Sequence, residues 1–259
     1  MENTMTPKPQ VFEDLLYELF ALPFSRSAEI KTVEQKIMAE LQKHPADICG
    51  LISLMFACIM QGNRSKAKEL AYKIWEIGGT LPPFFELVYT ENLLSLGLID
   101  MATILLKPRF EHLRENIEDF YSVLVKFAVM TGNIGLLKRL EAFPEASEGD
   151  ELLFEFAALY EEANCQAQFK DIQKLVLEHS ADYLCAYEYN LYDDRNFAEL
   201  EIVVYVNFDD ISCIKMQSNI ENKIEAYWRS TGKDRLYNLS VLVRNIKQHE
   251  SWIEEEEEA

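Results

Sequence analysis

The chain has 259 residues, of which 49% are hydrophobic, and it carries a formal net charge of −19 from 44 acidic and 25 basic side chains. This hydrophobic content is sufficient for a large core and excludes a chain that is disordered throughout. The negative charge disfavours binding to nucleic acids and to anionic membranes, and it favours either a basic protein partner or simply solubility.

Residues 1–9 are expected to form a flexible arm, and apolar residues then recur at helical spacing. Pro23 and Pro108 are expected to end the first and sixth of these helices, because proline cannot continue a helix. The apolar stripe of the first helix is expected to pack on the first helical hairpin. The expected helices are residues 11–20, 32–43, 48–61, 65–77, 84–96, 99–107, 115–131, 134–143, 150–163 and 166–179.

Three glycines, Gly62, Gly97 and Gly132, lie 35 residues apart between paired helices. Because glycine takes the left-handed conformation without a Cβ clash, each is expected to end one helix and let the next fold back. Ala67 and Ala102 follow the first two glycines at the same offset. Such self-similarity is typical of stacked helical hairpins, so we predict a mainly α fold with an α-solenoid over residues 10–180.

The pattern changes near residue 182, and residues 182–248 are expected to form a small α+β domain. The order is strand, strand, helix, strand, with the last two strands parallel. The expected strands are 183–192, 199–207 and 236–246, and the expected helix is 209–230. Both faces of the second strand are apolar, so the sheet needs a further cover from the array, a second copy or a partner. Residues 249–259 read as an acidic disordered tail.

The helix–glycine–helix unit resembles the tetratricopeptide-repeat family over residues 46–180. The matching residues are Leu54, Gly62, Ala67, Gly97, Ala102, Leu124 and Gly132. Another helical-repeat superfamily is the alternative. The resemblance implies a curved array whose concave surface binds a peptide or a protein.

No catalytic motif stands out in the sequence. The four histidines are isolated, and phosphate loops, nucleophile elbows and metal-binding spacings are absent, so neither an enzyme nor a cofactor is predicted. Asp193, Asp194, Asp209 and Asp210 flank the second strand, where they can cap turns and helices or hold Mg²⁺. The second reading leaves a metal-dependent enzyme or metal-binding module as the alternative function.

Aromatic residues are the candidate interface. Phe84, Phe85 and Tyr89 lie on one expected helix, and Tyr187 and Tyr189 lie on one expected strand. Most are expected in the core, and any that are exposed would mark an interface, because tyrosine and tryptophan are enriched in binding hot spots.

The leading hypothesis is a non-enzymatic intracellular protein-binding module, namely an adaptor, a chaperone or an immunity-type inhibitor with an acidic helical-repeat surface. A cytoplasmic location is expected, because no secretory signal begins the chain and its five cysteines show no pairing pattern. No nucleic acid and no membrane is expected as a partner. A homodimer through the C-terminal sheet is a further hypothesis.

Overall fold

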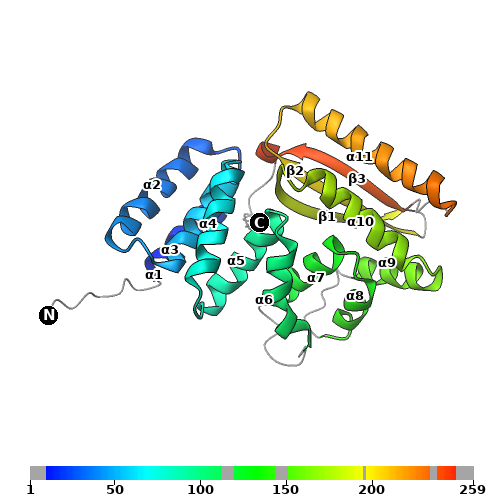
Figure 1. Ribbon diagram of the computed structural model, residues 1–259, viewed down its shortest axis with the longest axis horizontal. Helices are drawn as coiled ribbons and strands as arrows, with labels where there is room; N and C mark the ends of the chain where they lie inside the picture. Colours follow the sequence, from blue (N-terminus) through cyan, green and yellow to red (C-terminus); the bar gives the residue numbers. More distant parts are fainter. Residues whose placement is uncertain (1–9, 112–119, 144–150, 195–196, 234–237, 249–259) are drawn as a thin grey trace, which may run out of the picture.

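The computed structural model describes residues 10–111, 120–143, 151–194, 197–233 and 238–248 (Figure 1). Within them, ten helices precede a three-stranded sheet, which confirms the predicted mainly α fold with a small α+β part. The helices are α1 (Gln10–Phe20), α2 (Ser27–Lys43), α3 (Ile48–Met60), α4 (Arg64–Ile77), α5 (Pro83–Ser95), α6 (Ile99–Glu111), α7 (Tyr121–Met130), α8 (Ile134–Leu140), α9 (Glu151–Glu162) and α10 (Gln166–Ser180).

Each repeat glycine ends a helix through the same pair of backbone hydrogen bonds. At the end of α3, Gly62 N donates to Ile59 O (2.8 Å) and Asn63 N donates to Cys58 O (2.8 Å). This is the Schellman arrangement, which requires a left-handed residue. The φ angles of Gly62, Gly97 and Gly132 are +68°, +68° and +62°. The predicted local role of the glycines is therefore confirmed.

Asn164 takes the place of glycine in the last hairpin. Its φ is +55°, and Cys165 N donates to Tyr160 O (2.7 Å) as in the other turns. Asparagine tolerates this conformation better than other residues that carry a Cβ. The hairpin geometry thus continues to α10, although the glycine spacing does not.

The glycines also lie where the C-terminal part of the chain packs on the array. A Cβ on Gly132 would stand 2.5 Å from Lys170 Cα of α10, and one on Gly62 would stand 2.5 Å from Asn207 Cγ. A Cβ on Gly97 would lie 3.5 Å from Leu184 Cδ2. Each of the three glycines is therefore in close contact with a residue from the C-terminal part of the chain, namely Asn207, Leu184 or Lys170.

The sheet contains β1 (Leu184–Asp194), β2 (Phe197–Val206) and β3 (Leu239–Asn245) in that order. β1 and β2 pair antiparallel, whereas β2 and β3 pair parallel, as predicted, with α11 (Asp210–Thr231) as the connection. A short 3₁₀ helix, η3 (Ile246–Gln248), follows β3.

Helices of the array pack against this sheet, which was one of the three expected covers. α9 contacts β1 and β2, α5 contacts β1, and α11 contacts β3. The exposed fraction is 0% for Ile202 and 1% for Val203, so both faces of β2 are buried. Buried side chains of the array and the sheet form one continuous cluster. The predicted boundary near residue 182 is thus a change of secondary structure within a shared core.

Arg64 at the start of α4 connects three segments of backbone. Its Nη2 donates to Leu96 O (2.6 Å) and to Ala181 O, and its Nε donates to Leu184 O (2.9 Å). Leu96 and Ala181 are the C-cap residues of α5 and α10. The guanidinium therefore neutralises the negative ends of two helices and holds the start of β1.

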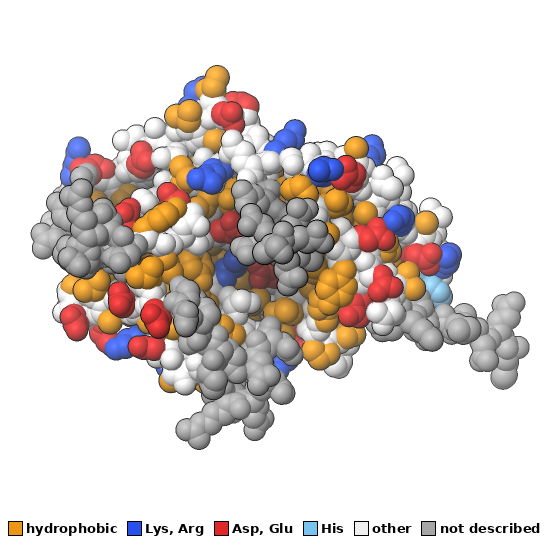
Figure 2. All heavy atoms as spheres, turned by 180° about the vertical axis from the view of Figure 1, so that it is seen from behind, with side chains coloured by type: hydrophobic (Ala, Val, Ile, Leu, Met, Phe, Trp, Pro, Cys, Tyr) orange, Lys and Arg blue, Asp and Glu red, His pale blue; other side chains and the backbone are white. Residues whose placement is uncertain are grey.

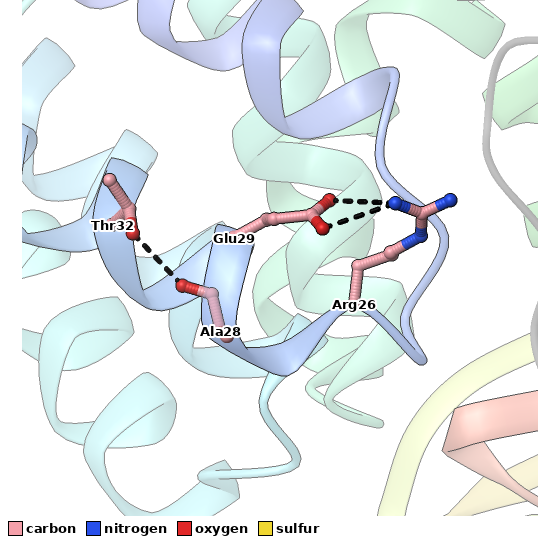
Figure 3. A network of polar contacts seen from close by, with 4 residues as sticks. All are labelled: Arg26, Ala28, Glu29 and Thr32. Atoms are coloured by element: carbon pink, nitrogen blue, oxygen red, sulfur yellow. Dashed lines mark hydrogen bonds and ion pairs between the residues drawn. The ribbon is translucent and has the colours of Figure 1, made fainter.

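Some helix boundaries differ from the predictions. α6 continues through Pro108 to Glu111, so the prediction that this proline ends the helix is wrong. α2 begins at Ser27, before the predicted residue 32. Around this start, Arg26 pairs with Glu29 (3.1 Å) and Thr32 Oγ1 donates to Ala28 O (3.0 Å) (Figure 3). Three of the predictions concern segments outside the described residues. These segments are the arm 1–9, part of the helix expected at 115–131, and the tail 249–259.

Candidate functional site

A groove crosses several helices of the array, with a cavity of about 380 Å³. It is formed by α1, α3, α5 and α7, so residues far apart in sequence meet there. Its lining residues are Phe20, Phe56, Phe84, Leu87, Val88, Glu91, Asn92, Ser122, Val123 and Lys126. Ligand sites are typically of this kind, with apolar walls and few polar groups.

Three of the lining residues occupy equivalent positions of the repeat. Phe56, Glu91 and Lys126 are separated by 35 residues, and each precedes its repeat glycine by six. They lie on α3, α5 and α7, and α5 contacts both α3 and α7, so the three side chains line one cavity. The spacing that relates the glycines therefore also relates these three residues of the groove, and it was the signal in the sequence that could have identified them.

The charged groups of the groove are paired with one another. Lys126 Nζ donates to Glu91 Oε1 between α7 and α5, and these side chains are only 12% and 20% exposed. A second pair joins α6 and α5 outside the lining of the groove, where Arg109 Nη2 lies 3.1 Å from Glu86 Oε2. The groove itself is therefore locally neutral, in contrast to the strongly acidic chain as a whole.

Aromatic rings form one end of the groove. Phe20 packs against Phe56 at a centroid distance of 5.0 Å, and Tyr17 stacks on Phe84 at 5.4 Å. Tyr17 remains 49% exposed. Seen from behind, hydrophobic side chains interrupt the charged surface in several places (Figure 2). Large rings of this kind supply much of the binding energy of protein interfaces.

Asn92 provides an unused polar group at the groove. It is 1% exposed, and its Nδ2 has no hydrogen-bond partner among the described residues. A buried amide without a partner costs about 1–3 kcal/mol. Rotation of this side chain toward the groove would let an acceptor of a bound molecule, such as a peptide carbonyl, recover part of this cost.

The predicted interface residues divide into two groups. Phe84 lines the groove and Tyr189 is half-buried. Phe85, Tyr89 and Tyr187 are at most 2% exposed, so they lie in the core, as expected for most of these residues, and are removed from the candidate interface. Their apolar rings fill the core, and two of their hydroxyls have internal partners. Tyr89 OH donates to Ala71 O (2.8 Å), and Tyr187 OH donates to Gln173 Oε1 (2.9 Å).

The aspartate cluster has a structural role where it is described. Asp209 caps α11 and accepts hydrogen bonds from Ser212 N and Ser212 Oγ, both at 2.9 Å, which lower the pKa of its carboxyl. The side chains of Asp193 and Asp194 lie outside the described part. Elsewhere in that part, no three histidine, cysteine or acidic side chains are grouped as metal ligands. The geometry thus gives the magnesium hypothesis no specific support.

The cysteines are poorly placed for nucleophilic chemistry. Burial raises the pKa of Cys49 to about 12 and the pKa values of Cys58 and Cys185 to about 11. The pKa of the buried Cys213 is also raised, and only Cys165 is partly exposed. Because the thiolate is the reactive species, these thiols are expected to be inert near neutral pH.

Labelling of the native chain with a chromogenic disulfide reagent at pH 8 tests this expectation. Cys165 should react first and the remaining thiols slowly, because they are protonated and shielded. All five should react after unfolding in guanidinium chloride. Rapid native labelling of a second cysteine would contradict the inferred burial.

Comparisons of the chain with protein-family models, curated proteins and solved structures give no match. The site is therefore interpreted from its own geometry. None of the described helices has the length and apolar character needed to span a membrane.

Proposed function

We propose that this chain is a non-enzymatic protein-binding module, in the class of adaptors, chaperones and inhibitors, and that the groove across α1, α3, α5 and α7 holds the partner. The observation that carries the proposal is a solvent-open groove whose walls are mainly apolar and come from four helices. The paired charges and the buried, unpaired amide of Asn92 support it.

The chemistry of the groove favours a segment with apolar anchors. Phe20, Phe56 and Phe84 provide the aromatic wall, while Glu91 and Lys126 already neutralise each other. A charged side chain entering the groove would lose hydration without gaining a free counter-charge. We infer that aliphatic or aromatic residues of the partner enter the groove and that a backbone carbonyl reaches Asn92.

The net charge of −19 acts at longer range. An acidic surface accelerates encounter with a basic partner and raises the salt dependence of the association rate, while apolar contacts determine the dissociation rate. The proposed partner is therefore a protein with a basic surface and an exposed apolar segment. A cytoplasmic setting is part of the proposal.

Affinity purification from the native cell tests the proposal with two matched variants. Leu87 is half-buried at the groove, and Ile104 is 59% exposed on α6 outside it. Leu87→Asp should weaken retention of the partner about 30-fold or more, because it places a charge in the apolar contact. Ile104→Asp should retain the partner as the unmodified chain does, and both variants should give the unmodified circular dichroism spectrum.

Two outcomes would contradict the proposed site. A partner retained equally by both variants would bind at another surface. The absence of any specifically retained protein at low salt would oppose a protein-binding function altogether, since electrostatic attraction is strongest under that condition.

A further inference from the structure

β3 is an edge strand, and its hydrogen-bonding pattern shows which of its backbone groups face outward. Leu200 N donates to Asn238 O (2.9 Å), so residue 238 faces β2. Backbone direction alternates along a strand, so residues 240 and 242 also face β2. Leu239, Val241 and Val243 therefore direct their N–H and C=O groups away from the sheet.

Only one of the outward N–H groups is occupied by a side chain of α11. Val243 N donates to Gln217 Oε1 (3.2 Å), and Gln217 Nε2 in turn donates to Glu221 Oε1 (3.0 Å). In the part of the chain that the structure describes, the outward groups of Leu239 and Val241 have no hydrogen-bond partner. An open edge of this kind is a template for a further strand.

A groove runs between this edge and α11, which lies alongside β3 (Figure 1). The cavity measures about 430 Å³ and is lined by Leu239–Leu242 of β3 and by one side of α11. The apolar part of that side is formed by Ile224 and Trp228. Backbone groups and an apolar wall are thus available to the same occupant.

The charge of this groove is negative. Glu201, Glu221 and Glu225 line it, and among the described residues that line it there is no lysine or arginine. Glu221 and Glu225 are one turn apart on α11, so they form a row beside the strand edge. Arg229 pairs with Glu225 at 3.2 Å, but its side chain is 78% exposed, so a ligand can compete for this carboxylate.

We propose that the outer edge of β3 binds an extended, lysine- or arginine-bearing segment of a partner protein as a fourth strand. Its backbone pairs with Leu239 and Val241, and its basic side chains pair with Glu221 and Glu225. The aliphatic stems of the same basic side chains contact Trp228, because alternate residues of a strand face the same side. This mode combines main-chain hydrogen bonds for affinity with side-chain pockets for specificity.

The alternative is that a second copy of the chain binds at the outer edge of β3. The acidic side chains of the groove disfavour this arrangement. Pairing of two β3 edges would bring two copies of α11, each with Glu221 and Glu225, toward one interface. Like charges at close range suppress such pairing, whereas a basic segment is complementary. The charge of the groove therefore favours a heterologous partner.

Nuclear magnetic resonance of the ¹⁵N-labelled full chain tests the proposal with a synthetic peptide of alternating lysine and valine. The Val241 amide should exchange with solvent rapidly in the free chain and about tenfold more slowly at saturating peptide, because a new hydrogen bond protects it. Peptides of alternating glutamate and valine should not bind. A lysine–valine peptide methylated at alternate backbone nitrogens should not bind either, since it lacks the donors that pair with the strand.

Charge variants provide a second, independent readout. The double variant Glu221→Gln and Glu225→Gln should raise the dissociation constant of the peptide about tenfold, because two ionic contacts are lost. The matched control Glu155→Gln and Glu162→Gln changes two exposed carboxylates of α9 and should leave it unchanged. Leu87→Asp should also leave it unchanged, so failure here is distinguishable from failure of the groove across α1, α3, α5 and α7.

The inference would be overturned if the lysine–valine peptide did not bind. It would also be overturned if the bound peptide slowed amide exchange at other residues but not at Val241, or if the methylated peptide bound as tightly as the unmethylated one. Light scattering completes the test, because a peptide-free dimer whose Val241 amide is already protected would show that a second copy occupies the edge.

Discussion

Gly132→Ala is expected to destabilise the chain by about 3–5 kcal/mol, which would lower its melting temperature by about 10 °C. Two costs add. Alanine is disfavoured at φ +62°, and its Cβ would lie 2.5 Å from the Cα of Lys170, a backbone atom that cannot move without displacing α10. Thermal and chemical unfolding of the variant measure the loss.

Alanine variants of other glycines distinguish the conformational cost of a positive φ angle from the steric cost of the added Cβ. Gly232, Gly97 and Gly62 have φ angles of +61°, +68° and +68°, so the conformational cost of alanine is similar at each. An added Cβ meets nothing within 4 Å at Gly232, an ordinary contact at Gly97 and the Asn207 side chain at Gly62. Destabilisation should therefore increase from Gly232→Ala through Gly97→Ala and Gly62→Ala to Gly132→Ala. Equal effects at all four positions would show that the approach of α10 contributes nothing.

This series shows what the sequence could and could not predict about the glycines. Their position after apolar helical runs is sufficient to predict left-handed helix ends, because that rule is local. Their contacts with Asn207, Leu184 and Lys170 depend on how the C-terminal part folds back on the array. Such contacts join residues about 40 to 145 positions apart in the chain, and no local pattern records them.

The groove illustrates the same limit. Phe20 and Phe84 lie on different helices and meet only because α1 packs against α3. Phe84 and Phe85 are adjacent in sequence, yet one lines the groove and the other is 1% exposed. Helical spacing predicts that neighbouring residues face different directions, but not which of the two faces the solvent. The predicted order of strands and α11, by contrast, follows from patterning within each segment.

The two proposed binding surfaces lie on different elements and differ in charge. Glu91 in the groove of the array is already paired with Lys126, whereas the described residues that line the groove around Glu221 include no lysine or arginine. A single partner with an apolar anchor and a separate basic strand could occupy both. Avidity would then make the combined affinity exceed that of either site, provided that the partner's linker spans them.

Replacement of Arg64 is the second change with a large expected effect. Arg64→Leu should destabilise the chain by about 2–4 kcal/mol, because three carbonyl oxygens lose a charged donor and two helix C-termini lose a neutralising cation. Burial lowers the pKa of Arg64, but the guanidinium remains charged at all pH values of interest. The loss should therefore be the same at pH 6 and pH 9.

A surface arginine provides the matched control for this change. Arg26 pairs with Glu29 at 3.1 Å, but the two side chains are 60% and 50% exposed (Figure 3). Arg26→Leu should therefore change the unfolding free energy by less than about 0.5 kcal/mol. A comparable loss in both variants would show that removal of a positive charge from an acidic chain, rather than the contacts of Arg64, causes the effect.

The part of the chain that loses stability in Arg64→Leu distinguishes a local role of Arg64 from a general effect on the whole chain. Arg64 holds Leu96, Ala181 and Leu184, which are the points where α5, α10 and β1 meet. Amide exchange in Arg64→Leu should therefore accelerate most in β1 and at the end of α10, and least in α2. Arg64→Lys should recover only part of the stability, since one ammonium cannot reproduce the fixed geometry with which a guanidinium reaches three acceptors. Uniform acceleration across the array, or full recovery by lysine, would show that this junction depends on apolar packing rather than on the arginine.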